Sequence, residues 1–147
     1  MYERTPLQAL ILGFAGLIPF FALALAAWVS SPDNAALATR YLAYYGAVIL
    51  SFVGALHWGF AMALPIDAFE RGRIYGWSVC PALAAWFALL LPTAGGLALI
   101  AVMFLLHYRM DRRVARLTVL PAWYLKLRLW LTLGAVAALL AALPRAV

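Results

Sequence analysis

Two histidines, an aspartate and an arginine are the residues of this chain with the clearest capacity for chemistry in an apolar setting. His57 lies within the long apolar run 36–64, and His107 lies near the end of a later apolar run. Asp111 follows in a basic segment, and Arg128 lies in the first turns of the last apolar run. Polar groups cost free energy in hydrocarbon, so those that are present usually have a partner or a task.

The two imidazoles indicate two kinds of ligand. Histidines from different helices can hold a haem or a metal ion, and a neutral imidazole can bond to a quinone carbonyl or a lipid headgroup. We expect no metal site and no cofactor, because the sequence shows no third ligand and places His57 and His107 at different depths. A haem or metal ion held by the two histidines is the alternative.

Asp111 is an isolated acid in the basic segment RMDRRVARLTVL. Such a residue is most often a solvated ion-pair partner. The functional interpretation is that it fixes Arg128 or His107 at the inner mouth of a helix bundle. Arg128 and Lys126 are about 200° apart around a helix, so both cannot face the same medium. An inward Arg128 would make an anion site suited to a phospholipid phosphate.

These residues predict a polar pocket that opens towards the cytoplasmic leaflet and binds a ligand. Its predicted members are His57, Trp58, Tyr75, Trp77, His107, Asp111 and Arg128. No catalytic residue is predicted, because Ser51 is expected to bond its own i−4 carbonyl and has no Gly-x-Ser-x-Gly elbow around it. Anionic lipid headgroups are expected at Arg109, Arg112, Arg113, Arg116 and Lys126.

Membrane-spanning helices are the elements that must position these side chains. Hydrophobic residues make up 68% of the 147 residues and charged residues 11%, whereas a soluble domain carries about 25% charged residues. The composition predicts an all-α integral membrane bundle, one domain over residues 1–147. The five predicted spans cover residues 7–29, 36–64, 74–91, 95–108 and 121–143, with a basic joint over 109–120.

The basic residues predict the orientation of this bundle. Five spans put the termini on opposite sides. The joints on the N-terminal side hold nine basic residues, Arg4, Arg71, Arg73, Arg109, Arg112, Arg113, Arg116, Lys126 and Arg128, and the other side holds Arg40 and Arg145. The positive-inside rule then places the N-terminus in the cytoplasm and the C-terminus outside. Because the basic residues flank apolar spans, we expect membrane lipids as partners and no nucleic acid.

Two sequence features bear on helix packing and on transport. Small residues recur at helical spacing and predict a small-residue face for close contact with another helix: Ala43, Ala47, Ser51 and Gly54. The sequence shows no internal repeat, so an inverted-repeat transporter is not supported.

Three stretches resemble a known family. They are YGAVILSFVGALHWG at residues 45–59, the start of the third span at Tyr75 and Trp77, and LPAWYLKLRLWLT at residues 120–132. With these, the chain from about residue 40 onward resembles the family of small multi-spanning membrane proteins of unknown function that includes mitochondrial transmembrane protein 69. The resemblance implies a five-helix inner-membrane protein of bacteria and mitochondria, and it implies no reaction.

The sequence thus favours a non-enzymatic, multi-pass protein of the bacterial inner membrane that binds lipid, quinone or a partner subunit. Such a protein suits the role of an accessory or assembly factor of a larger membrane complex. The alternatives are a haem or metal protein ligated by His57 and His107, a small transporter, and a lipid-modifying enzyme with His57 as its base.

Overall fold

The computed structural model describes residues 5–146 and is all-helical over that range. Pro19 and Gly16 interrupt the first apolar run, and prolines or glycines stand at most of the turns between the later runs. The helices are α1 (Leu7–Ala15), α2 (Ile18–Val29), α3 (Pro32–Ala63), α4 (Ala68–Ala88), α5 (Thr93–Leu117) and α6 (Ala122–Ala142), and a short 3₁₀ turn, η1 (Leu143–Arg145), follows.

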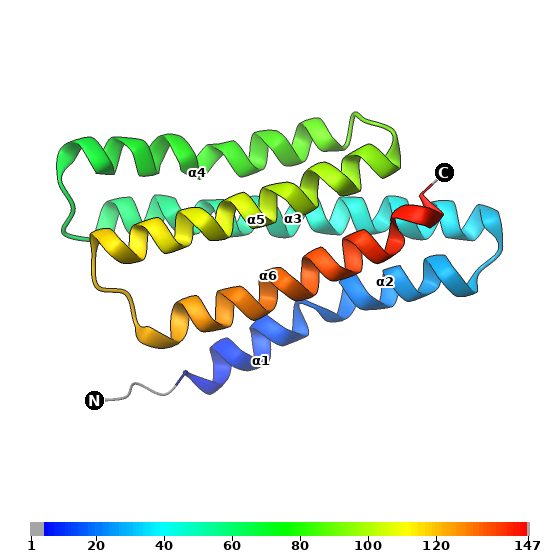
Figure 1. Cartoon of the computed structure of the whole chain (residues 1–147), viewed down its shortest axis with the longest axis horizontal. Coiled ribbons are helices and arrows are strands. Elements are labelled where there is room, and N and C mark those ends of the chain that lie inside the picture. The colour runs from blue at the N-terminus through cyan, green and yellow to red at the C-terminus, as the bar shows by residue number, and fades with distance from the viewer. Residues whose placement is uncertain (1–4, 147) are drawn as a thin grey trace.

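The helices form an elongated bundle around α3 (Figure 1). Helix α3 contacts α2, α4, α5 and α6, whereas α4 lies along one side and the α1–α2 pair lies along the opposite side. The two ends of the chain lie at opposite ends of the bundle. The predicted all-α bundle is therefore confirmed.

Four segments are long and apolar enough to cross a membrane: Leu7–Val29, Pro32–Ala63, Thr93–Leu117 and Ala122–Arg145. The third predicted span, residues 74–91, corresponds to α4, which is not among these four and carries Glu70, Arg71 and Arg73 in its first turns. A membrane protein with several apolar helices is thus supported. The count of five crossings and the inward N-terminus remain predictions.

The first span is broken and not merely kinked. Helix α1 ends at Ala15 and α2 begins at Ile18, with Pro19 in the first turn of α2, where its missing N–H costs least. The hydroxyl of Tyr45 donates a 2.9 Å hydrogen bond to the carbonyl of Gly16 at the break. A side chain from α3 therefore satisfies a backbone group that the break exposes.

Two other boundaries differ from the predicted ones. Helix α4 begins at Ala68 and not at residue 74, because the Asp67 carboxylate caps it by accepting from the N–H groups of Phe69 and Glu70 at 2.9 and 3.0 Å. Helix α5 runs unbroken from Thr93 to Leu117, so residues 109–117, predicted as part of a basic joint, continue the helix of the fourth predicted span. No proline or glycine interrupts that stretch, and its buried face continues through Asp111 and Val114.

The small-residue face of α3 is buried, as predicted. Ala43 and Ala47 lie in the core, and the Ser51 hydroxyl donates to the carbonyl of Ala47 at 2.8 Å. A Cβ added at Gly54 would lie 3.0 Å from the carbonyl oxygen of Ser78 in α4. Gly54 thus lets the backbones of α3 and α4 approach closely.

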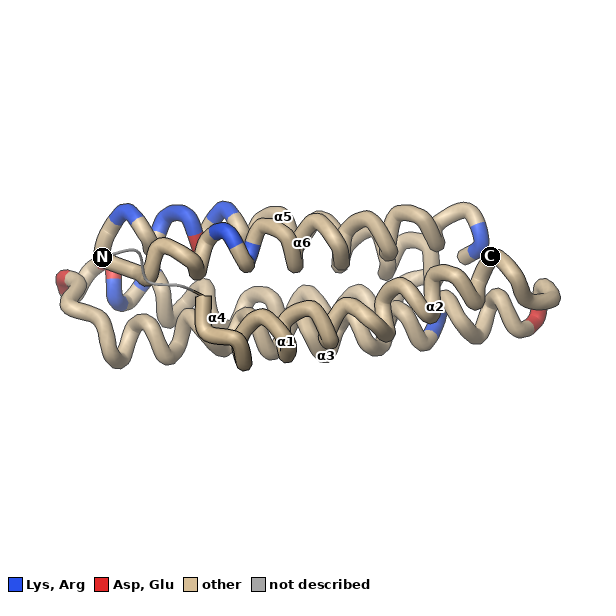
Figure 2. Tube along the Cα trace, turned by 90° about the horizontal axis from the view of Figure 1, so that it is seen from below, with Lys and Arg blue, Asp and Glu red and all other residues tan. Residues whose placement is uncertain are grey.

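Lysines and arginines gather at the end of the bundle where α5 ends and α6 begins (Figure 2). Arg40 of α3 lies beside Pro92 and Thr93 at the start of α5, and Arg145 lies in η1 after the end of α6, so both are at the opposite end of the bundle. There the Arg145 guanidinium donates to the carbonyl of Ala27, and the Trp28 indole donates to the carbonyl of Ala141. These two bonds tie η1 and the end of α6 to the end of α2.

Candidate functional site

Asp111 lies at the centre of a buried polar cluster between α3, α5 and α6, and its side chain is fully buried. Its Oδ2 accepts a 2.8 Å hydrogen bond from Nε of Arg128, and its Oδ1 accepts a 3.0 Å bond from the Tyr124 hydroxyl. Arg128 is itself only 7% exposed. A buried carboxylate and a buried guanidinium are stable in such a place only as a bonded pair.

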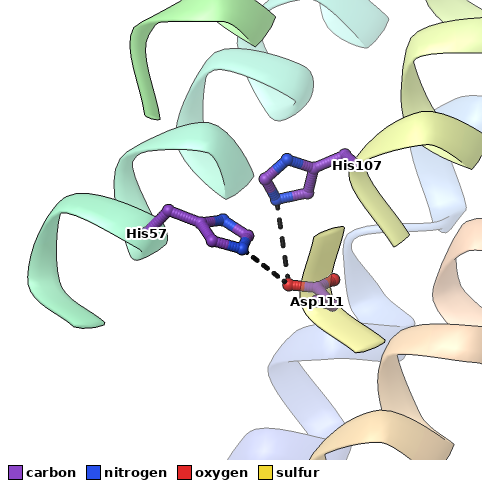
Figure 3. A group of neighbouring side chains, drawn as sticks. All are labelled: His57, His107 and Asp111. Carbon is purple, nitrogen blue, oxygen red and sulfur yellow. Dashed lines mark ion pairs between the residues drawn. The ribbon is translucent and has the colours of Figure 1, made fainter. Parts of the chain in front are cut away.

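Two imidazoles converge on the same carboxylate (Figure 3). Nε2 of His57 lies 3.6 Å from Oδ1 of Asp111, and Nε2 of His107 lies 3.9 Å from it. The two rings are 4.4 Å apart between centroids and nearly perpendicular. The expectation that His57 and His107 lie at different depths is therefore wrong, because the tilt and offset of α3 against α5 bring them level.

Helical spacing explains how α5 and α6 present these groups. His107 and Asp111 are four residues apart on α5, and Tyr124 and Arg128 are four residues apart on α6, so each pair shares one helix face. Tyr124 is the member of the cluster that sequence reasoning missed. Its four-residue spacing from Arg128 was the available signal.

Trp77 of α4 completes the cluster and fixes the tautomer of His107. Its indole N–H donates a 3.2 Å hydrogen bond to Nδ1 of His107. Because Nδ1 then acts as an acceptor, His107 is neutral and carries its proton on Nε2, the nitrogen that faces Asp111. We call His57, Trp77, His107, Asp111, Tyr124 and Arg128 the Asp111 cluster.

His57, His107 and Asp111 also form a possible metal-ligand set, with one donor atom from each within 4.8 Å of the others. Asp111 is the third ligand that the sequence analysis did not recognise. Two features oppose a metal ion: ligation through Nε2 of His107 would turn a proton on Nδ1 towards the Trp77 donor, and Arg128 already balances the Asp111 charge. A haem between the histidines is opposed by their 4.4 Å separation, which leaves no space for a porphyrin.

An apolar cleft of about 350 Å³ adjoins the cluster. Its walls come from α1, α2, α3, α5 and α6, and most of the lining side chains are aliphatic or aromatic. Its polar side chains include Tyr124, Arg128 and Thr132, which follow one another at four-residue intervals on α6. His57 and Asp111 do not line it and lie behind Arg128.

Two side chains of this wall, Arg128 and Thr132, each hold a buried polar atom with no hydrogen-bond partner among the described residues: Nη2 of Arg128 and Oγ1 of Thr132. Buried polar groups are nearly always hydrogen-bonded, and a helical threonine ordinarily bonds the carbonyl four residues before it. Thr132 does not do so. The two atoms are therefore suited to bond a molecule in the cleft.

The remaining predicted site residues lie elsewhere. Trp58 is 49% exposed, stacks edge-on against Tyr75 and lines a different hollow with Ser78. Lys126 is exposed. A basic hollow beside Trp77 is lined by four of the five residues predicted to meet anionic lipid, Arg109, Arg112, Arg113 and Arg116. Among these, Arg113 pairs with Glu70 of α4 at 2.9 Å.

Two vertebrate proteins are similar to the chain over most of its length. It is 38% identical over 145 residues to "Transmembrane protein 69" of Xenopus tropicalis, covering 96% of this chain and 55% of the frog protein. It is 30% identical over 131 residues to "Transmembrane protein 69" of Mus musculus, covering 89% of this chain and 53% of the mouse protein. The chain thus spans about half the length of these relatives. No solved structure matches.

The family model described as "Protein of unknown function (DUF3429)" matches residues 5–144. That match covers both histidines, Asp111, Arg128 and the whole cleft. The predicted resemblance is confirmed, and the chain belongs to the DUF3429 family of membrane proteins of unknown function, which includes transmembrane protein 69.

Proposed function

We propose that this protein is a non-enzymatic membrane protein that binds a lipid or quinone in the cleft between α1, α3 and α6. One observation carries the proposal: the apolar cleft is lined by Arg128 and Thr132, and each of these side chains holds a buried polar atom that has no partner within the described chain. Ligand sites are typically apolar cavities with a few convergent polar groups.

The shape of the cleft suits a molecule with an apolar body and a polar head. Leu12, Phe52 and Leu131 offer a wall for a chain or ring, and Arg128 with Thr132 offers donors for oxygen atoms. The Asp111 cluster holds Arg128 in place through the 2.8 Å bond to Nε, which leaves Nη2 for the ligand. Most of the Asp111 cluster therefore positions Arg128 from behind, and only Tyr124 and Arg128 line the cleft themselves.

We further propose the bacterial inner membrane as the location and an accessory or assembly role as the task. The concentration of arginines at one end of the bundle supports a cytoplasmic, lipid-facing end. The basic hollow of Arg109, Arg112 and Arg116 would contact anionic headgroups there. A subunit of a larger membrane complex is the partner that this role requires.

The test fills the cleft with a larger side chain. Ala9 lines the cleft, and Ala9→Phe should reduce the co-purifying lipid or quinone several-fold, measured by solvent extraction and mass spectrometry per mole of protein. The matched control is Ala22→Phe on the outer face of α2, which lines a separate shallow hollow and should change nothing. Equal ligand content in wild type and both variants would rule out the cleft as the binding site.

A further inference from the structure

We infer that the ligand of the cleft carries a neutral carbonyl oxygen at its head and is a quinone, not an anionic lipid. This inference rests on the proposed function and names the class of its ligand. Three features of the site carry it: its charge balance, its unpartnered donors and its depth.

The charge balance disfavours an anion. Asp111 and Arg128 form a buried pair with no net charge, and the hydrogen bond from Trp77 makes His107 neutral. Lys126 is exposed and does not line the cleft. A carboxylate or phosphate bound at Arg128 would place a second anion opposite the one guanidinium that already serves Asp111, in an apolar surrounding where uncompensated charge is costly.

The unpartnered groups suit a carbonyl. Nη2 of Arg128 and the hydroxyl of Thr132 are both donors without a partner, and the two residues share one face of α6 because they are four apart. A carbonyl oxygen accepts up to two hydrogen bonds and brings no charge. The aromatic rings of Phe20, Phe52 and Phe104 in the lining can pack against a planar head.

The depth of Arg128 and Thr132 in the membrane favours a quinone over a phospholipid or a diacylglycerol. Arg128 and Thr132 lie six and ten residues after Ala122, the start of α6, and therefore about 9 and 15 Å along the helix. The predicted topology puts the start of α6 at the membrane surface, where the interfacial layer is only about 5–7 Å thick, so both side chains are predicted to lie below that layer. The ester carbonyls of a glycerolipid are held near that layer by the polar glycerol or headgroup, whereas the head of a quinone is free to lie deeper.

The experiment measures binding of decylubiquinone to the full-length protein in nanodiscs, with oleate, phosphatidylglycerol and diacylglycerol as competitors. We expect saturable quinone binding that none of the three competitors displaces at equal concentration. Thr132→Val should weaken it about tenfold, the effect of one lost hydrogen bond, and Thr132→Ser should restore it. The matched control is Thr39→Val, whose buried hydroxyl bonds the Ala36 carbonyl in its own helix and does not line the cleft.

The results that would contradict the quinone assignment differ from those that would contradict the proposed function. Displacement of quinone by oleate or phosphatidylglycerol, or quinone affinity unchanged in Thr132→Val, overturns the quinone assignment and leaves a lipid-binding cleft intact. Binding of diacylglycerol without binding of quinone does the same. If Ala9→Phe changes the binding of none of these ligands, both this inference and the proposed function are wrong.

Discussion

Asp111 and Arg128 depend on each other because both side chains are buried among helices. In Asp111→Asn the Arg128 guanidinium would lose its charged partner, and we expect a loss of about 3–5 kcal/mol of stability. The double variant Asp111→Asn/Arg128→Gln removes both charges and should be more stable than Asp111→Asn alone. Thermal unfolding in detergent measures both. Asp33→Asn, at an exposed position, is the control, and a double variant less stable than Asp111→Asn would contradict the pairing.

The tautomer of His107 is a second prediction at the residue scale. The bond from Trp77 to Nδ1 requires a neutral ring with its proton on Nε2. The side-chain ¹⁵N shifts of His107 should show one protonated and one bare nitrogen, and Trp77→Phe should change them while the His57 shifts move less. A doubly protonated His107 at neutral pH would contradict this and would also weaken the case for a neutral ligand.

At the scale of the helices, close contact between α3 and α4 depends on Gly54. A Cβ there would lie 3.0 Å from the Ser78 carbonyl oxygen and 3.0 Å from Cβ of Pro81, and backbone atoms cannot yield easily. We expect Gly54→Ala to cost about 1–3 kcal/mol. Gly59→Ala in the same helix meets nothing within 4 Å and should be neutral or slightly stabilising. Equal stability of the two variants would mean that α4 can shift away from α3 without cost.

For the whole molecule, the number of crossings decides on which side the C-terminus lies. Five crossings with the N-terminus inside would place the end of η1 outside, and the arginines at the other end of the bundle agree with that orientation. A topology reporter fused after Arg145 should therefore report a location outside the membrane. The same kind of reporter inserted at Pro65, between α3 and α4, should report a location inside. A cytoplasmic reading at Arg145 would mean that α4, which is not among the four long apolar segments, does not cross.

Properties that depend on composition and on the helical period could be predicted from the sequence alone. Apolar runs predicted a helical membrane protein, and the angle between Lys126 and Arg128 required them to face different media, which the exposed Lys126 and buried Arg128 satisfy. The small face of α3 followed from spacing in the same way. These properties are local, since the 3.6-residue period fixes which side chains share a face.

Contacts between side chains of different helices depend on the tertiary structure. The tertiary structure brought His57 and His107 level, directed Trp77 of α4 to His107, added Tyr124, and excluded Trp58 and Tyr75 from the hydrogen bonds of the cluster. It also opened the cleft between α1, α3 and α6. The physical reason is that a sequence period gives the faces of each helix but not the rotation, tilt and offset of one helix against another. Those are set by how small and large side chains on neighbouring helices interdigitate.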